Sequence, residues 1–358
     1  MIDSSSFTVG FVSSPHPHAP MHIKTLDGLT EVEEVHLCGL EGEDLEAMAM
    51  KSSKVRSQTS SLEKLLGLSH LDALVVSVRN DLCCTVLDAA LESGLPVLFE
   101  KPGATHASDL RRVAQKAELN KVPMGAMYTN RWSPEMKDVC ESVKGGGLGK
   151  VMAVESRMVT SQVRYRDPKH WLFSKEFAGS GILSWLACHH IDLLCYLLGE
   201  PIVEVSAMVA SNNPETVEVE DTAMVTVRFE SGVLGTVHAG YHLAGSAAGY
   251  AGGSYDAFLG LRGVKGYISM PWATHDSFEM YSEAEGWESD CLRQLNYDIP
   301  ESLAYGGKAG EEFVLDFLRA CRTGSTIPAP IDAAVHVLDV IEAALESSVT
   351  GRTVMVTV

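Results

Sequence analysis

The sequence predicts a two-domain chain, with a doubly wound, parallel α/β sheet followed by an α+β domain that has an open, mostly antiparallel sheet and flanking helices. Three observations lead to this prediction. With 358 residues, the chain is longer than one hydrophobic core usually spans. In its first third, short apolar runs of strand length alternate with helical segments, which is typical of βαβ units. In its second half, successive strands are separated by short turns, which is typical of antiparallel pairing.

The first domain is expected to hold five parallel strands joined by helices. The predicted strands are 7–14, 32–40, 71–78, 96–99 and 122–128. The predicted helices begin near residue 20 and cover 43–51, 83–93 and 107–119. The run 71–78 is mostly apolar, which suits a strand covered on both faces of a parallel sheet. Gly94 follows the third helix, where a glycine commonly ends a helix.

The pattern changes after the fifth strand, and we expect a domain boundary near 126–132. A helix over 133–144 ends at three glycines, and a strand over 150–159 follows it. After a loop-rich stretch, a helix is predicted over 182–198. The remaining strands are predicted over 203–211, 222–230, 233–241, 257–262, 266–270 and 352–358, with closing helices over 311–322 and 331–348. The predicted domains are 1–128 and 129–358.

The net charge, the apolar runs and the cysteine content argue against several classes of protein. The formal net charge of −19 argues against nucleic acid or an anionic membrane as the main partner, because both would repel the chain. The first residues lack the basic start and apolar core of a signal peptide, and no run approaches the roughly 20 apolar residues of a membrane span. Eight cysteines without a C-x-x-C pair are typical of reduced thiols. We therefore expect a cytoplasmic protein.

The tripeptide Glu100-Lys101-Pro102 directly follows the predicted strand 96–99. It lies at a carboxyl end, where open α/β sheets bind their ligands. A second segment, 179–192, supplies His189 and Asp192. These two residues are three apart and share one face of the predicted helix. Since a histidine can donate or accept a proton, the two segments together suggest proton transfer beside a bound cofactor.

These motifs, together with the order of the two sheets, resemble the Gfo/Idh/MocA family of oxidoreductases, and the resemblance covers nearly the whole chain. Asn80 and Arg131 fall where the family has an asparagine and an arginine, and residues 219–223 and 229–235 are similar to its antiparallel sheet. The resemblance implies a Rossmann-like dinucleotide-binding domain over 1–128. It also implies a substrate-binding and oligomerisation domain over 129–358.

The resemblance further implies a reaction: hydride transfer between NAD(H) and a sugar, cyclitol or related polyhydroxylated molecule. Lys101 would lie near the nicotinamide and the substrate hydroxyl, Pro102 would follow a cis peptide bond, and His189 would be the acid/base. The chemistry is consistent, because oxidation of an alcohol needs a hydride acceptor and a base. A cationic lysine would stabilise the developing alkoxide.

The phosphate-binding loop departs from the family. The glycine-rich sequence falls on residues 13–18, which read Ser-Ser-Pro-His-Pro-His. Glycines there normally let the backbone approach the pyrophosphate. Ser13 and Ser14 can still donate hydrogen bonds, whereas the two prolines cannot donate from the backbone. We expect a dinucleotide to bind through altered contacts that involve His16 or His18.

The ribose-binding acid of the family falls on Gly39, and Glu41 is close enough to replace it. An acid there favours NAD over NADP because it repels a 2′-phosphate, and that loop contains no arginine. NAD is therefore the predicted cofactor and NADP is less favoured. The predicted cofactor-binding residues are Ser13, Ser14, His16, His18, Glu41, Asn80, Glu100, Lys101, Pro102 and Arg131.

Trp185 stands four residues before His189, where the family often has an aspartate that works with the histidine. A tryptophan offers a stacking surface of the kind that sugars favour. We also expect substrate contacts from the segment before this helix and from one strand of the second sheet. The predicted substrate-binding residues are Tyr165, Lys169, His170, Trp185, Asp192, His238, Tyr241 and His242.

Three alternatives stay open at this point. Loss of the aspartate suits an enzyme that cleaves glycosides by transient oxidation and elimination, and loss of the glycines suits a non-catalytic sugar or dinucleotide sensor. The pattern His16-x-His18 with His22 resembles the start of a metal-dependent hydrolase, but that fold needs an eight-stranded barrel, so no metal is predicted.

An uncovered apolar sheet face would need a partner, which predicts a homodimer or homotetramer.

Overall fold

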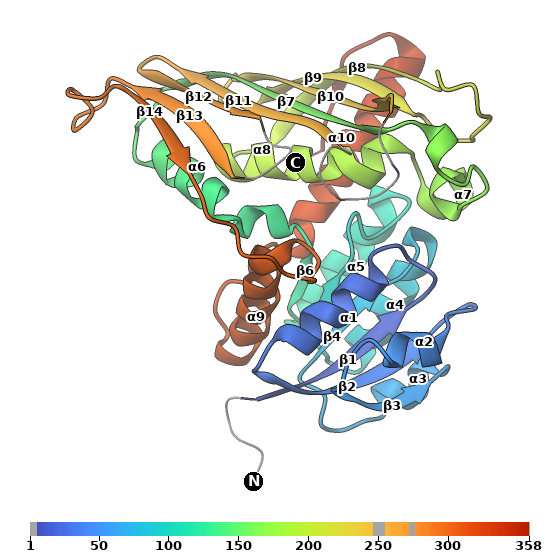
Figure 1. The fold of residues 1–358 in the computed structure, drawn as a ribbon. Coiled ribbons are helices and arrows are strands. Elements are labelled where there is room, and N and C mark those ends of the chain that lie inside the picture. Colours follow the sequence, from blue (N-terminus) through green and yellow to red (C-terminus); the bar gives the residue numbers. More distant parts are fainter. Residues whose placement is uncertain (1–5, 246–254, 272–275, 358) are drawn as a thin grey trace. The chain divides into compact units, whose positions relative to one another are not determined.

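The computed structural model describes residues 6–245, 255–271 and 276–357. The chain forms two compact units, each of which is built from two stretches of sequence (Figure 1). The first unit contains Met1–Trp132 and Pro300–Val335, and the second contains Ser133–Ile299 and His336–Val358. The returning segment Pro300–Val335 therefore completes the first unit. The functional division into domains 1–128 and 129–358 stays a prediction.

A six-stranded parallel sheet forms the centre of the first unit, with the order β3-β2-β1-β4-β5-β6. The strands are β1 (Phe7–Ser13), β2 (Val32–Gly39), β3 (Val55–Thr59), β4 (Ala73–Ser77), β5 (Val97–Phe99) and β6 (Met124–Ala126). This is the order of the dinucleotide-binding fold, in which the strand order reverses beside β1 and ligands bind at the carboxyl ends. The predicted doubly wound parallel sheet is confirmed.

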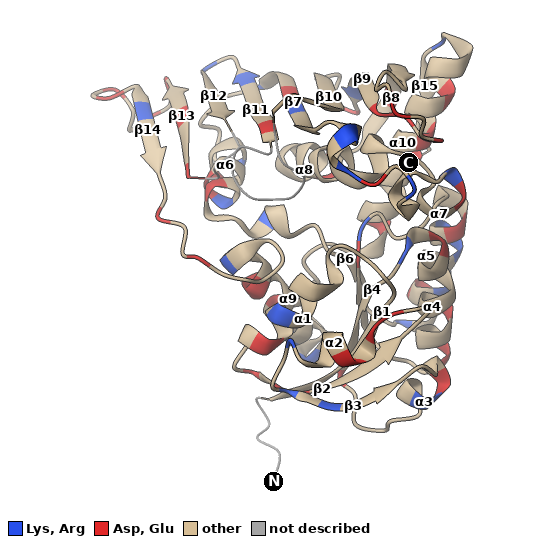
Figure 2. Ribbon diagram, turned by 45° about the vertical axis from the view of Figure 1, so that its right-hand side comes forward, with Lys and Arg blue, Asp and Glu red and all other residues tan. Residues whose placement is uncertain are grey.

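Helices surround this sheet. They are α1 (Ala19–Gly28), α2 (Leu45–Ala49), α3 (Leu62–Leu66), α4 (Asn80–Glu92), α5 (Ala107–Asn120), the 3-10 turn η1 (Thr129–Trp132) and α9 (Gly307–Thr323). β1 and β4 carry no charged residue and are fully buried, whereas charged residues lie along α4 and α5 (Figure 2). The sequence analysis missed β3 and α3. β3 is a polar and largely exposed edge strand, so it lacks the apolar run that marks a buried strand.

A nine-stranded sheet forms the second unit, with the order β14-β13-β12-β11-β7-β10-β9-β8-β15. The strands are β7 (Val151–Ser161), β8 (Ile202–Ala210), β9 (Thr222–Phe229), β10 (Leu234–Leu243), β11 (Tyr255–Gly263), β12 (Gly266–Pro271), β13 (Ser277–Ser282), β14 (Leu292–Asn296) and β15 (Val354–Met355). Neighbours are antiparallel except β7 and β10, which are parallel. The predicted open, mostly antiparallel sheet is confirmed, although β13 and β14 were not predicted.

Helices cover one face of this sheet (Figures 1 and 2). They are α6 (Pro134–Lys144), α8 (Cys188–Leu198) and most of α10 (Ile331–Thr350); short turns are η2 (Val163–Tyr165), η3 (Trp171–Phe173), α7 (Lys175–Ala178) and the π-helical η4 (Leu183–Ala187). Along β9, Val225 and Val227 are buried, whereas Met224 between its buried neighbours is 49% exposed. Alternation along a strand places these residues on opposite faces, so the other face of the sheet is open.

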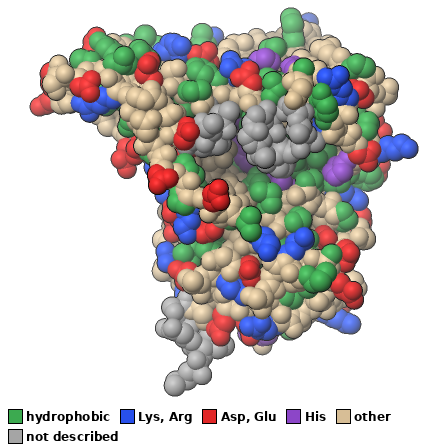
Figure 3. All heavy atoms as spheres, viewed as in Figure 1, with side chains coloured by type: hydrophobic (Ala, Val, Ile, Leu, Met, Phe, Trp, Pro, Cys, Tyr) green, Lys and Arg blue, Asp and Glu red, His purple; other side chains and the backbone are tan. Residues whose placement is uncertain are grey.

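One helical stretch, Lys175–Leu198, meets the length and hydropathy expected of a membrane span, but 83% of its most apolar window is buried within the protein. A core helix has the same properties. Among the described residues on the face drawn in Figure 3, basic side chains are interspersed with acidic ones and do not gather into one broad patch.

Candidate active site

The strand order brings most of the predicted cofactor residues to one edge of the first sheet. Ser13 ends β1, Glu41 follows β2, Asn80 begins α4 directly beyond β4, and Lys101 follows β5. Parallel strands have their carboxyl ends at the same edge, which is where such sheets bind ligands. The peptide bond between Lys101 and Pro102 is cis, which confirms the prediction for that bond.

Lys101 and Glu100 are buried charges, with 1% and 3% of their surface exposed. One carboxylate oxygen of Glu100 accepts a hydrogen bond of 2.8 Å from the backbone N–H of Lys101. The other oxygen contacts Nδ1 of His18 and lies 3.5 Å from Nε2 of His22. A carboxylate can only accept, so His18 donates its Nδ1–H. The lysine is therefore held beside an anchored carboxylate.

The surroundings of Glu100 and His18 determine which of the two side chains is charged. Burial alone would raise the pKa of Glu100, but the charges of His18 and Lys101, with hydrogen bonds from the histidines, hold it well below its usual range. Burial lowers the pKa of His18 to about 4, against the pull of Glu100. At neutral pH, an ionised Glu100 therefore faces a neutral His18.

The amino end of α1 has few backbone donors left for a phosphate. Pro20 has no N–H, and the neighbouring N–H groups bond to carbonyl oxygens of the preceding loop. These bonds are Ala19 N to His16 O (3.1 Å), Met21 N to His18 O (2.8 Å) and His22 N to His18 O (3.0 Å). The backbone cradle that glycines usually provide is thus largely occupied, and the altered contacts expected for a dinucleotide stay a prediction.

The ribose side of the site holds an arginine that the sequence analysis missed. Arg79, from the turn after β4, forms an ion pair of 2.9 Å with Glu41 and also pairs with Asp81. Its backbone N–H donates to the hydroxyl of Ser14 (3.0 Å). The loop after β2 contains no arginine, but Arg79 stands beside Asn80, which places it at the carboxyl end of a neighbouring strand.

The returning segment Pro300–Val335 closes over the histidines. The ring centroid of Tyr305 lies 4.5 Å from those of both His18 and His22. Arg131 is buried and donates to the carbonyl oxygen of Pro328 at 3.2 Å, so it also holds this segment. Sequence patterns gave no sign of Tyr305, because almost 300 residues separate it from the loop that it covers.

His189 lies near the start of α8, with 8% of its surface exposed, and Asp192 on the same helix is 2% exposed. The helix predicted over 182–198 is not regular, because Leu183–Ala187 forms a π-helical turn directly before α8. Such turns occur frequently at functional sites. Trp185 lies in this turn, is buried, and has its ring 6.4 Å from that of Trp171.

Glu220 anchors the amino end of this helical region and was not predicted. Its buried carboxylate accepts hydrogen bonds from the N–H groups of Gly181 (2.9 Å) and Leu183 (3.0 Å). Burial raises its pKa, against the effect of these bonds. A Cβ at Gly181 would collide with the carbonyl oxygen of Glu220. The glycine is therefore required for the approach that positions the turn before His189.

The three predicted residues before this helix differ in their surroundings. The hydroxyl of Tyr165 accepts from the N–H of Gly245 (3.3 Å), and Lys169 is exposed. His170 is half-buried, and burial lowers its pKa. Its Nδ1 accepts from the N–H of Leu172 (3.3 Å).

Strand alternation separates the three residues predicted on β10. Tyr241 is buried and packs against Phe173, with ring centroids 5.6 Å apart. His238 lies between two buried residues and pairs with Met224 across the sheet, which places it on the open face. His242 has its ring 5.9 Å from that of His238 and bonds with Thr222 (2.6 Å). The structure thus does not bring Tyr241 and His238 together.

Arg166 is a further residue that the sequence analysis did not select. Its guanidinium lies 5.0 Å from the ring centroid of Tyr241 and donates to the hydroxyl of Ser161 (2.9 Å). It is half-buried, which is costly for a charge unless the charge has partners. It adds a fixed cation to the covered face of the second unit.

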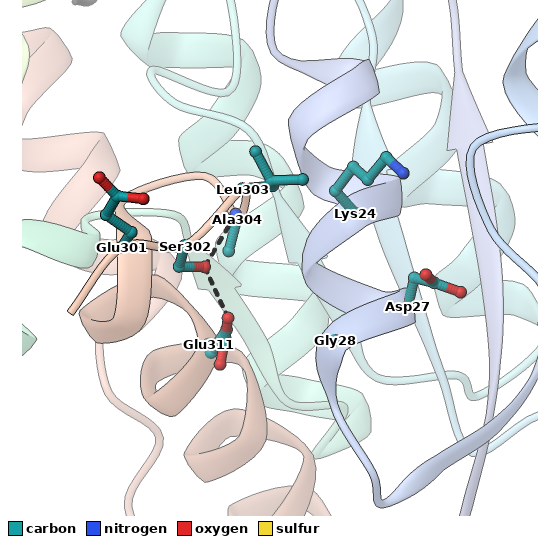
Figure 4. Close-up of a pocket in the computed structure, with 8 residues that line it drawn as sticks. All are labelled: Lys24, Asp27, Gly28, Glu301, Ser302, Leu303, Ala304 and Glu311. Atoms are coloured by element: carbon teal, nitrogen blue, oxygen red, sulfur yellow. Dashed lines mark hydrogen bonds between the residues drawn. The ribbon is translucent and has the colours of Figure 1, made fainter.

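One pocket lies apart from the candidate site, and the cluster of His16, His18 and Glu100 does not support the metal alternative. A pocket of about 640 Å³ in the first unit is lined by none of the predicted residues (Figure 4); its lining is Lys24, Asp27, Gly28, Glu301, Ser302, Leu303, Ala304 and Glu311. Ligand atoms of His16, His18 and Glu100 lie within 4.8 Å of one another, but His18 and Glu100 already bond directly. The open sheet also excludes the eight-stranded barrel of the hydrolase alternative.

Acid should destabilise this protein through His18, and replacement by glutamine should remove that effect. The unfolded chain protonates His18 near pH 6.5, whereas the folded chain does so only near pH 4. The unfolded state therefore binds more protons in this interval, and the free energy of unfolding falls as the pH drops through it. Between pH 7 and pH 4, the free energy of unfolding should therefore fall by about 3 kcal/mol less in His18→Gln than in the wild type.

Urea unfolding at several pH values measures this difference. His106→Gln is the control, because His106 is exposed at the start of α5, and it should follow the wild-type curve. If His18→Gln also follows that curve, the neutral state assigned to His18 is wrong.

Two family models match well over half of the chain. Residues 9–128 match the family described as "Oxidoreductase family, NAD-binding Rossmann fold". Residues 136–269 match the "GFO/IDH/MocA C-terminal domain". The resemblance and the cofactor class expected from the sequence are confirmed.

Curated relatives and solved structures agree with this match. The chain is 28% identical over 186 residues to 1,5-anhydro-D-fructose reductase of Ensifer adhaerens, which covers 51% of the chain and 55% of that protein. It is 26% identical over 172 residues to myo-inositol 2-dehydrogenase of Thermotoga maritima, which covers 47% of the chain and 49% of that protein. The chain thus spans about half the length of these curated relatives.

A solved structure of levoglucosan dehydrogenase, in complex with NADH and levoglucosan, superposes with a TM-score of 0.86 at 19% identity, covering 99% of this chain and 100% of that chain. This likeness shows the fold. None of these three proteins is named as a glycoside-cleaving enzyme or a sensor, so neither alternative gains support.

Proposed function

Because the chain belongs to the Gfo/Idh/MocA oxidoreductase family, we propose that it is an NAD(H)-dependent dehydrogenase or reductase acting on CH–OH groups of a sugar, cyclitol or related polyhydroxylated molecule. The observation that carries the proposal is the buried Lys101, fixed after β5 by a cis-proline and an ionised Glu100. The carboxyl end of a strand is where open α/β sheets bind their ligands, so the charge of Lys101 lies where it can act on one.

Lys101, His189 and Asp192 have separate roles in the proposed reaction. A bound nicotinamide supplies the hydride acceptor. Lys101 stabilises the negative charge that develops on the substrate oxygen. His189 takes the proton from the alcohol, or returns it to the ketone in the reverse direction. Asp192 is the candidate for orienting the imidazole, since the position that the family often gives to an aspartate holds Trp185.

The cofactor residues fit NAD at its two ends more closely than at its centre. Lys101 and Pro102 suit the nicotinamide end, and Glu41 suits the ribose hydroxyls. Between them, the occupied N–H groups of α1 leave the pyrophosphate to side chains of the loop 13–18, which include Ser13, Ser14 and His16. Asn80 completes this edge, and Arg131 supports it through the returning segment. Arg79 also lies at this end of the site, where it is paired with Glu41 and Asp81.

The substrate class rests on two kinds of support. Relatives are named for 1,5-anhydro-D-fructose and myo-inositol, and a structural neighbour contains levoglucosan. The second unit also holds the half-buried Trp171 beside the buried Trp185, and the half-buried Arg166 beside the buried Tyr241. Rings and a fixed cation are the groups that hold polyhydroxylated molecules.

The open face of the second sheet suits a homodimer or homotetramer. It exposes Met208, Met224 and Leu234, at 80%, 49% and 46% of their surface, and His238 lies among them. Large apolar groups gathered on one face favour association with a partner. We propose a cytoplasmic homo-oligomer that pairs through this face.

The direct test is formation of NADH, followed by absorbance at 340 nm, with levoglucosan, myo-inositol and a panel of aldoses and polyols. Consumption of NADH with 1,5-anhydro-D-fructose tests the reverse direction. Turnover of at least one member that saturates with NAD is expected. Product formation from a glycoside without net NADH would instead favour transient oxidation and elimination. Binding without turnover across the panel would favour a sensor.

A further inference from the structure

A second cluster of metal-binding side chains lies away from the carboxyl edge of the first sheet. Glu34 and His36 are two residues apart on β2 and therefore share one face of the strand. His70 comes from the segment between α3 and β4, before the amino end of β4. One ligand atom from each residue lies within 4.8 Å of the other two.

The distances in this cluster match those around a tetrahedral metal ion. Nε2 of His36 lies 3.2 Å from Nε2 of His70 and 3.7 Å from Oε2 of Glu34. A zinc ion with bonds of about 2.0–2.1 Å holds its ligand atoms about 3.3–3.4 Å apart. Both separations can therefore become edges of one coordination tetrahedron through small side-chain movements.

Neighbouring groups orient the ligands. Nδ1 of His36 bonds with the hydroxyl of Ser57 at 2.7 Å, and such a bond leaves the lone pair on Nε2 facing the cluster. Arg56 lies 3.4 Å from the second oxygen of Glu34.

The exposure of the three side chains leaves a path for an ion. His36 has only 8% of its side chain exposed, Glu34 has 36%, and His70 lies at the surface. An ion would thus be held from the inside by His36 and capped from the outside by His70, with water completing the shell. Two imidazoles and one carboxylate form a donor set that suits zinc.

We propose that Glu34, His36 and His70 bind a divalent zinc ion that ties the segment before β4 to β2. The competing arrangement is a direct imidazole–imidazole hydrogen bond between His36 and His70, which the same 3.2 Å separation allows. The proposal is independent of the redox function, because its residues lie at a different part of the sheet from Lys101 and Glu41.

Calorimetric titration of the chelator-treated full chain with zinc chloride tests the proposal. The wild type should bind zinc saturably, and His70→Ala should weaken this binding by at least about tenfold, the size of effect that even an outer-shell change can produce. His70 is exposed, so its removal should not unfold the chain. His36→Ala should weaken binding further, with folding checked by circular dichroism.

Glu33→Gln is the matched control. It removes the same charge as Glu34→Gln from the neighbouring position, and Glu33 lies outside the cluster, where its carboxylate accepts a hydrogen bond from the hydroxyl of Ser6 (2.9 Å). Wild-type zinc affinity in Glu33→Gln, with weaker binding in Glu34→Gln and His70→Ala, supports the site. Absence of saturable binding to the wild type, or unchanged affinity in His70→Ala, overturns it. A zinc-induced rise in melting temperature that disappears in His70→Ala is an independent readout of the same site.

Discussion

Replacing Lys101 with methionine should lower kcat by on the order of 100- to 1,000-fold, the usual loss when one group that stabilises an oxyanion is removed. Methionine keeps the length and apolar stem of the side chain but removes its charge. The loss should fall on kcat more than on KM, because an alkoxide develops only as the reaction proceeds. Initial rates with NAD and the best substrate of the panel measure both constants.

Folding must be checked in this variant, because the change leaves Glu100 buried without its cation. The charge of Lys101 helps to keep the buried Glu100 ionised, so the melting temperature should fall. Lys101→Arg keeps the charge and provides a second variant. Lys116→Met, at an exposed position on α5 that pairs with Asp88, should behave as the wild type. A folded Lys101→Met protein with nearly full kcat would contradict the role given to the lysine.

Replacing His189 with asparagine should lower kcat by about 100- to 10,000-fold, which is the contribution of a well-placed general acid or base. Asparagine can occupy the same buried position and form hydrogen bonds, but it cannot take up a proton near neutral pH. The dependence of kcat on pH that the imidazole imposes should also disappear. A merely structural residue would change the rate without changing the shape of this pH profile.

His190→Asn is the matched control for this experiment. His190 is the next residue on α8, is even more deeply buried, and uses its Nδ1 to bond with Ser156. The same substitution there disturbs the helix and its packing but leaves the proposed acid/base in place. We expect most activity to survive in His190→Asn. Equal losses in both variants, or a pH profile unchanged in His189→Asn, would show that His189 acts only through packing.

The fold was predictable from sequence wherever burial leaves a periodic pattern. β1 and β4 are covered on both faces and read as apolar runs, and β9 alternates because one of its faces is open. β3 and β14 were not predicted from the sequence because they are edge strands with few buried residues. Their position depends on pairing with a neighbour rather than on a core of their own.

The site was predictable where function follows local position. Lys101 stands directly after a strand, and the strand order alone carries it to the ligand-binding edge. Tyr305 and Glu220 were missed because they reach their partners across long stretches of sequence, which no local pattern reports. The position of His238, in contrast, follows from a local pattern. Its neighbours Val237 and Ala239 are apolar and buried, so strand alternation places His238 on the open face of the sheet.

We propose that an NAD site persists although the glycines of the loop 13–18 are missing and the N–H groups of α1 are largely occupied. Calorimetric titration with NAD, NADH, NADP and NADPH, on protein freed of bound nucleotide, tests it most directly. We expect NAD or NADH to bind at least about tenfold more tightly than its phosphorylated counterpart, since Glu41 repels the 2′-phosphate. Folded protein that binds none of the four nucleotides would contradict the claim.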